Sequence, residues 1–212
     1  MNYQDGLACL SGQAVYMAFL EQNLTPGRLQ HSLEVMTVMG NLAEAHGLDL
    51  VQALTVGLLH DAAKDMPASE MLKLAHEAHF DFHYPCEWTP MYLHGPVGAW
   101  LMHEKLGVDD PAVLEAVYRH TWVEGSHWAD SKLTWCMRFA DFLAPSRSWR
   151  TFNRRLEPAA FDPARFGEAR SLVTQRAISL GDPVHPLMFK IREKALRHFP
   201  VQMTPDEMEN FS

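Results

Sequence analysis

The sequence holds 212 residues, of which 47% are hydrophobic and 21% are charged, and its formal net charge is −8. This length suits one well-buried core, and the composition is that of a folded globular protein, which excludes a disordered chain. The acidic balance, without a long basic run, argues against a nucleic-acid binder. A local cationic pocket for a phosphate is still compatible with it.

The cysteines lie far apart in the chain and form no pair at redox or metal-binding spacing; they are Cys9, Cys86 and Cys136. This pattern predicts neither a disulfide framework nor a thiolate zinc site. The first residues lack the basic stretch and apolar core of a signal peptide, and no apolar run reaches spanning length. We therefore expect a cytoplasmic protein that has no membrane partner.

The first helices are predicted from apolar spacing and from their end signals. Residues 8–20 carry the apolar positions of a short leading helix that packs on the body. Thr25 as N-cap, with a proline after it, starts a second helix whose periodic apolar residues run to Ala45. Gly47 suits the left-handed position that follows a helix, so it should end this one.

The rest of the chain continues the helical pattern. Asp49 opens the next helix, and Asp110, followed by a proline, is the expected N-cap of a later one. Residues 80–89 are rich in aromatics and indicate a loop. No segment alternates with period two, so we predict an all-α protein, an orthogonal helical bundle. Its further helices are expected over 49–63, 69–79, 94–106, 112–120, 133–143, 166–180 and 186–198.

One apolar helical run, Gly-Leu-Leu-His-Asp-Ala-Ala-Lys over 57–64, places two ionisable residues side by side. Burying the carboxylate of Asp61 next to His60 is costly unless it is paired, hydrogen-bonded or bound to a metal. The pair therefore indicates a cation. Lys64 lies one turn beyond His60, where its ammonium either reaches a phosphate at that cation or simply faces solvent. The sequence favours neither reading of Lys64.

Further ionisable residues fall on or beside apolar helical faces, and they are His31, His94, His120 and Asp141. A single histidine in a core is more often a hydrogen-bonded structural residue than a ligand. Together with His60 and Asp61, however, these residues form a set that suits Fe, Mn, Co or Zn. A rival group at 76–83, formed by His76, His79 and His83, has no acid in an apolar run beside it. We interpret that group as a solvated helix face.

The order of these motifs resembles the HD-domain phosphohydrolase superfamily, in the version whose extra histidines hold two metals. Arg-Leu-Gln-His-Ser at 28–32, the run at 57–64, Leu-His-Gly at 93–95, Arg-His-Thr at 119–121 and Phe-Ala-Asp at 139–141 are similar to its bacterial YqeK-type branch. The resemblance implies one HD domain over 25–150, with an N-terminal helix at 1–24 packed on it. Residues 151–212 would be a C-terminal helical extension of the same domain.

The resemblance also implies the site and its chemistry. One metal would be held by His31, His60, Asp61 and Asp141, and Asp61 would bridge to a second metal that His94 and His120 complete. Iron is the favoured metal, with Mn, Co or Zn as alternatives. Asp61 and Lys64 would be catalytic, while the residues expected to contact substrate are Arg28, Lys64, Trp122 and Arg147.

The activity implied is symmetrical hydrolysis of diadenosine tetraphosphate, or of a related dinucleoside polyphosphate, to two nucleoside diphosphates by a metal-bound hydroxide. The partner is then a small nucleotide, and the resemblance and the apolar tail point towards a homodimer. One alternative on this scaffold is a nucleotide phosphatase or cyclic-nucleotide phosphodiesterase. Another, of a different class, is a non-catalytic nucleotide sensor.

Two segments depart from the usual pattern of the family. Trp-Val-Glu stands at 122–124, where members continue the His-Thr motif with a small residue and glycine. Ala144 and Pro145 stand where members place Glu-Pro before the arginine, which is Arg147 here. Both segments lie close to the positions where the family binds substrate, so they bear on nucleotide specificity more than on metal chemistry.

Overall fold

The computed structural model describes residues 1–80, 92–121, 130–179 and 197, and every regular element within them is helical. The all-α prediction is confirmed, and the fold is a helical bundle. The longer helices are α2 (Gln13–Asn23), α3 (Pro26–His46), α4 (Leu50–Leu59), α5 (Ala68–Glu77), α6 (His94–Leu106), α7 (Pro111–His120), α8 (Lys132–Leu143), α9 (Arg150–Ala160) and α10 (Phe166–Ser179). A short helix α1 (Tyr3–Ala8) precedes them.

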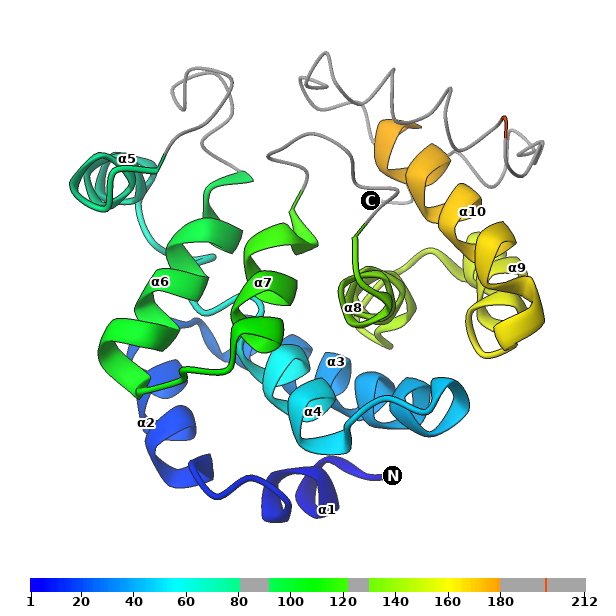
Figure 1. The fold of residues 1–212 in the computed structure, drawn as a ribbon, viewed down its shortest axis with the longest axis horizontal. Coiled ribbons are helices and arrows are strands. Elements are labelled where there is room, and N and C mark those ends of the chain that lie inside the picture. Colours follow the sequence, from blue (N-terminus) through cyan, green and yellow to red (C-terminus); the bar gives the residue numbers. More distant parts are fainter. Residues whose placement is uncertain (81–91, 122–129, 180–196, 198–212) are drawn as a thin grey trace.

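Helices α3 and α4 form the base of the bundle, and a glycine sets how closely they pack. A Cβ added at Gly57 would lie 2.7 Å from the Cα atom of Met36, which no side chain permits. The missing side chain therefore brings the end of α4 against α3. Figure 1 shows α6 and α7 on one side of this pair, and α8 between α7 and the α9–α10 pair.

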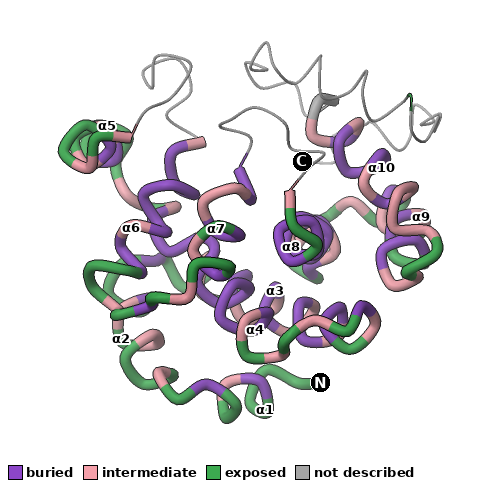
Figure 2. Tube along the Cα trace, in the orientation of Figure 1, coloured by how far each residue is buried: buried purple, intermediate pink, exposed green. Residues whose placement is uncertain are grey.

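The core is continuous from the first helices to the last. Buried apolar residues of α3, α4 and α7 join those of α8, and Phe152 and Leu172 extend the same cluster into α9 and α10. Figure 2 shows α4 and α8 as largely buried, whereas α1, α2 and α5 carry much of the exposed surface. No helix in the described part of the chain is long and apolar enough to cross a membrane.

Several helix ends follow the sequence prediction. Asp49 and Asp110 both act as N-caps, accepting hydrogen bonds from backbone N–H groups of Gln52 and of Ala112. Gly47 ends α3 with a φ of 63°, the left-handed conformation that a glycine adopts without a Cβ clash. These ends confirm that local capping chemistry fixed the limits of the central helices.

The structure corrects other predictions about the helices. The helix predicted over 8–20 begins later, because α1 ends at Ala8 and α2 starts only at Gln13. Thr25 occupies the N-cap of α3 without capping it, because its hydroxyl donates to Asp65 Oδ2 at 2.9 Å. Helix α9 was not predicted, since Pro158 and several arginines obscured it. The predicted helix over 186–198 and most of the loop over 80–89 lie outside the described residues.

The most consequential correction concerns the helix that was expected to carry the His-Asp pair. Helix α4 ends at Leu59, with His60 at its C-cap and Asp61 in the turns that follow. Short-range bonds from Ala62 N to Leu59 O and from Lys64 N to Asp61 O hold these turns. Asp61 therefore lies outside α4, because the chain passes from the helix into tight turns before it.

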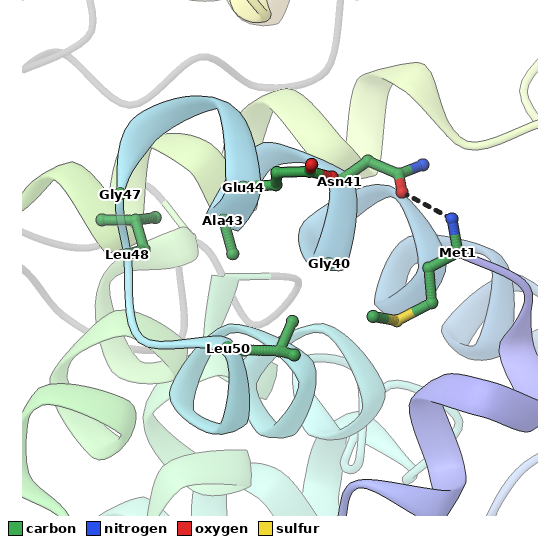
Figure 3. A pocket seen from close by; sticks show the side chains of 8 residues that line it. All are labelled: Met1, Gly40, Asn41, Ala43, Glu44, Gly47, Leu48 and Leu50. Atoms are coloured by element: carbon green, nitrogen blue, oxygen red, sulfur yellow. Dashed lines mark hydrogen bonds between the residues drawn. The ribbon is translucent and has the colours of Figure 1, made fainter.

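A cavity of about 360 Å³ lies between the end of α3 and the start of α4 (Figure 3). The amino group of Met1 donates to Asn41 Oδ1 at 2.9 Å at its edge. Glu44 is the one ionisable side chain among its lining residues. The cavity therefore offers no cluster of metal-binding or catalytic groups.

Candidate metal centre

The ionisable residues singled out from the sequence come together from five segments of the bundle. His31 lies on the buried face of α3, and His60 and Asp61 follow the end of α4. His94 is the first residue of α6, His120 the last of α7, and Asp141 belongs to the last turns of α8. Residues as far as 110 positions apart in the chain thus meet in one place.

These residues form two groups, in each of which one ligand atom per residue lies within 4.8 Å of the others. The first group is His31, His60 and Asp141, and we name it the Asp141 group. The second group is Asp61, His94 and His120, and we name it the Asp61 group. Both groups consist of imidazole nitrogens and carboxylate oxygens, which are ligands for divalent transition metals.

Asp61 lies between the two groups. Its Oδ1 is 3.3 Å from His94 Nε2 and 3.8 Å from His120 Nε2, while its Oδ2 is 3.5 Å from His60 Nε2. One carboxylate oxygen therefore faces each group. In the Asp141 group, His31 Nε2 is 3.1 Å from Asp141 Oδ1.

The outer ring nitrogens of three histidines are held by neighbours. His60 Nδ1 lies 2.9 Å from the carbonyl oxygen of Gly57, and His120 Nδ1 lies 2.6 Å from that of Val117. His31 Nδ1 lies 2.8 Å from Ser146 Oγ. Because an Nδ1–H that donates outward leaves Nε2 as a lone-pair donor, all three rings can present Nε2 to a metal.

One buried atom tests whether the cluster fits a metal. His60 has no exposed surface, and its Nε2 has no hydrogen-bond partner. Because Nδ1 donates to the Gly57 carbonyl, Nε2 of the neutral ring is an acceptor, and it faces another acceptor, the carboxylate oxygen Oδ2 of Asp61. A cation between the two atoms would satisfy both, so the donor set fits a divalent metal.

A comparison with known proteins agrees with this chemistry. The family model of the HD domain matches residues 28–143, which span all six ligand candidates. The chain belongs to the HD domain family. It is a hydrolase of the HD superfamily.

Known relatives are similar over much of this HD protein. The symmetrical bis(5'-nucleosyl)-tetraphosphatase of Bacillus subtilis is 33% identical over 153 residues, which cover 70% of this chain and 73% of that protein. The protein of the same name from Halalkalibacterium halodurans is 29% identical and covers 63% of this chain and 69% of the relative. A crystal structure from Clostridium acetobutylicum, described as a predicted HD superfamily hydrolase involved in NAD metabolism, has a TM-score of 0.77 at 26% identity, covering 87% of this chain and 96% of that one.

Cationic side chains of the HD protein surround the two groups. Arg28 Nη1 lies 3.2 Å from Asp61 Oδ2, and Lys64 Nζ lies 3.2 Å from His94 Nε2. Arg147 contacts Asp141 Oδ1 through Nη2 and donates from Nε to the carbonyl oxygen of Asp141 at 3.1 Å. Lys64 therefore lies beside the Asp61 group, and its contact with a phosphate stays a prediction.

The carboxylates are held in their charged form. Burial would raise the pKa of Asp61, but the neighbouring imidazoles of His60, His120 and His94 outweigh it and hold that pKa well below its usual range. Burial would also raise the pKa of Asp141, but the positive charge of Arg147 outweighs it and keeps that pKa well below its usual range. Both groups thus present a negative charge at neutral pH.

The histidines divide according to their neighbours. Burial, together with Lys64, lowers the pKa of His94 to about 4, and burial also lowers the pKa of His120. At His60, burial works in the same direction, but the Asp61 carboxylate outweighs it and raises the pKa. His94 and His120 are therefore neutral at pH 7 and ready to act as ligands.

The approach of α6 to α7 depends on the residue after His94. A Cβ added at Gly95 would lie 2.6 Å from Thr121 Oγ1 and 2.9 Å from the carbonyl oxygen of Tyr118. Glycine is therefore required for the start of α6 to reach the end of α7. The rings of His94 and His120 then lie 5.0 Å apart, with their Nε2 atoms 3.1 Å apart.

Two supporting residues were missed in the sequence. Ser146 contacts His31, and its backbone N–H donates to Glu34 Oε2 at 2.8 Å. Arg138, buried in α8, donates to the carbonyl oxygen of His120 and pairs with Asp130 at 2.6 Å. No local pattern marks these residues, because their partners lie far away in the chain. Only the neighbourhood of Arg147 could have drawn attention to Ser146.

The remaining candidates lie elsewhere. His76 and His79 are exposed at and after α5, as expected for a solvated face, and His83 lies outside the described residues. Trp122, the expected pocket wall, also lies outside them. Among the described residues, no third group of metal-binding side chains is present.

Proposed function

We propose that this HD protein hydrolyses a dinucleoside polyphosphate symmetrically, with diadenosine tetraphosphate as the substrate and two molecules of ADP as products. The observation that carries the proposal is the position of Asp61, whose two oxygens face two separate donor groups. The relatives from Bacillus subtilis and Halalkalibacterium halodurans carry the name of this activity.

The two groups would hold two divalent cations. His31, His60, Asp61 and Asp141 would bind one, and Asp61, His94 and His120 the other. When bound, a pair of cations neutralises phosphoryl oxygens and lowers the pKa of water nearby. Iron is the metal favoured by the family resemblance, while the imidazole and carboxylate donors themselves suit Fe, Mn, Co and Zn.

The chain's own cations would bind and orient the phosphates. Arg28 approaches from the side of Asp61, Lys64 from the side of His94, and Arg147 from the side of Asp141. Burial leaves the ammonium of Lys64 only weakly solvated, which lowers its pKa. The same ammonium can donate directly to a phosphoryl oxygen. Phosphoryl transfer needs alignment and charge neutralisation more than covalent chemistry, and these side chains supply both.

The central pair of phosphates would lie at the cluster, because cleavage into two equal halves requires attack on an inner phosphorus. The nucleoside diphosphate that leaves carries its new charge next to Lys64 or Arg147. The side chains that hold the phosphates thus also stabilise the leaving group. His94 and His120, which are neutral at pH 7, do not compete with the arginines for the substrate's charge.

Product analysis tests the proposal. The metal-loaded protein is incubated with diadenosine tetraphosphate in water enriched in ¹⁸O, and the nucleotides are separated and weighed. ADP is expected as sole product, with one ¹⁸O atom in the β-phosphate of half of the molecules. AMP together with ATP, or no turnover, would contradict the proposal. A panel of nucleoside monophosphates and cyclic nucleotides run beside it tests the phosphatase and phosphodiesterase alternatives.

A further inference from the structure

A cavity of about 330 Å³ opens where α8 passes into α9. Residues 143–145 form one wall, and Arg147, Arg150, Asn153 and Arg154 line the rest, with Glu157 as the single acid. We name it the arginine cavity. Figure 1 places α9 on the opposite side of α8 from α6 and α7, so the cavity lies on the flank away from the Asp61 group.

The charge around the arginine cavity is unbalanced. Arg150 and Arg154 are one turn apart on α9, both are exposed, and neither forms an ion pair within the described residues. Arg147 is already paired with Asp141, so Glu157 alone opposes the guanidinium groups of Arg150 and Arg154, in a chain whose net charge is −8. Like charges gathered around a hollow repel one another unless an anion neutralises them, so this arrangement favours a phosphate-bearing ligand.

Arg147 links the cavity to the metal centre. Its guanidinium contacts Asp141 Oδ1 and lies 3.4 Å from His31 Nε2, yet the same residue lines the arginine cavity. A chain of phosphates that starts at the cluster and passes Arg147 would therefore meet Arg150 and Arg154 next. The cavity is thus placed to continue the substrate site rather than to form a separate one.

An amide oxygen indicates that the ligand is more than a phosphate. Asn153 Oδ1 is buried in the wall of the cavity and has no hydrogen-bond partner. A buried acceptor without a partner is destabilising, and a ligand with a hydroxyl or amino group would satisfy it. A sugar or a base carries such donors. A fully ionised phosphate does not.

We infer that the arginine cavity binds one nucleotide arm of a dinucleoside polyphosphate, with Arg150 and Arg154 on its outer phosphate and Asn153 on its sugar or base. This inference rests on the proposed function. The volume of about 330 Å³ is at the lower limit of small-molecule pockets, which suits one arm and not a whole dinucleotide. The other arm then leaves the cluster on the side of Lys64.

Paired variants test the arginines. Arg150→Ala/Arg154→Ala is compared with Lys73→Ala/Lys105→Ala, which removes the same charge from exposed positions on α5 and α6. We expect KM for diadenosine tetraphosphate to rise about tenfold in the arginine variant, with kcat within about twofold, because the arm is bound equally in ground and transition states. The lysine variant should keep the wild-type KM. An unchanged KM in the arginine variant, or an equal rise in both, overturns the inference.

Asn153→Leu tests the nucleoside contact. It should raise KM for diadenosine tetraphosphate several-fold while the inhibition constant of inorganic tripolyphosphate, which has no nucleoside, stays at the wild-type value. An equal change for both compounds would show that the cavity holds phosphate only, which overturns the nucleotide assignment. If this variant fails to fold, as judged by its melting curve, the arginine variants still decide the case.

Direct binding separates this inference from the proposed function. If the wild-type protein cleaves no dinucleoside polyphosphate, the proposed function fails, and the cavity is then tested by calorimetric titration of metal-loaded protein with ADP. A tenfold weaker ADP affinity in Arg150→Ala/Arg154→Ala, with the lysine variant unchanged, supports the cavity by itself. Equal ADP affinity in all three proteins overturns it.

Discussion

The Asp61 group and the Asp141 group use the same donor types in different surroundings. The side chains of Asp61, His94 and His120 are between 4% and 6% exposed, so this group is enclosed. In the Asp141 group, the carboxylate is 26% exposed, and it is covered by Arg147, which is 27% exposed itself. Solvent and substrate therefore reach the cluster more readily on the side of Asp141.

The two groups also neutralise their negative charge differently. Asp141 is paired with an arginine, whose own pKa rises because the carboxylate outweighs the effect of burial. Asp61 is surrounded by imidazoles, two of which burial keeps neutral, and Arg28 reaches only its Oδ2. The Asp141 group is thus the more open one and has its own counter-ion in Arg147, whereas the Asp61 group is enclosed and surrounded by imidazoles.

The largest effect is expected from the residue that the two groups share. Asp61→Ala should remove both metal ions. Loss of a single electrostatic contact lowers kcat by about 100- to 1000-fold, and we expect a decrease at least that large. Metal analysis and turnover on the same sample check it. Full metal occupancy in this variant would show that the ligand assignment is wrong.

Substitution of one histidine in each group should separate the two sites. His31→Ala and His94→Ala are each expected to lower the metal content from about two ions to about one per chain, since each removes a ligand of one site only. Elemental analysis measures the content. The matched control is His103→Ala, an exposed histidine on α6 that should retain both ions. Loss of both ions in either variant would break the distinction between the groups.

The stability of the metal-free protein should depend on pH through the buried histidines and carboxylates of the two groups. His94 has a pKa of about 4 when folded, against about 6.5 for an unfolded histidine. Between these values the unfolded chain binds a proton that the folded chain does not, so acidification destabilises the fold. His60 has a raised pKa, so its effect on the pH dependence of stability has the opposite sign. It is present in both the wild type and the His94 variant, and its contribution is therefore shared.

His94→Gln should therefore lose less stability than the wild type between about pH 7 and about pH 4, by at most about 3 kcal/mol. Denaturant unfolding of the metal-free proteins at each pH measures this. Asp141→Asn should be less stable than the wild type above about pH 4, and this difference should shrink as the pH falls below that value, because the lowered pKa makes the carboxylate stabilising above it. Identical pH dependence in all three proteins would contradict the assignment.

The smallest effect is expected from Ser146, which holds His31 without facing the cluster. Ser146→Ala should weaken the ion of the Asp141 group about tenfold, the lower end of what outer contacts of a metal ligand contribute. In a His94→Ala background, manganese titration should show this loss, and in a His31→Ala background it should show none. Ser69→Ala, an exposed serine on α5, serves as control. A loss in the wrong background would mean that the serine acts through overall stability.

The sequence alone determined the helical class and the caps at Asp49, Asp110 and Gly47, and it predicted the six ligand candidates. Capping is local chemistry between residues that are neighbours in the chain, and a buried His-Asp pair is visible wherever it interrupts an apolar run. The sequence did not determine where α4 ends. It did not predict α9 either, because Pro158 and the arginines obscured the apolar stripe of Phe152, Leu156 and Ala159.

The family resemblance already implied two groups of ligands, but only the tertiary structure decided which outer residues support them. His31 and Ser146 are 115 positions apart, and no spacing rule joins them. The close packing that Gly57 and Gly95 permit brings α3 to α4 and α6 to α7, and this fixes which imidazoles meet. Spacing along a chain says which residues can share a face. Contact between faces depends on how whole helices pack, and that placed Asp61 between the two groups.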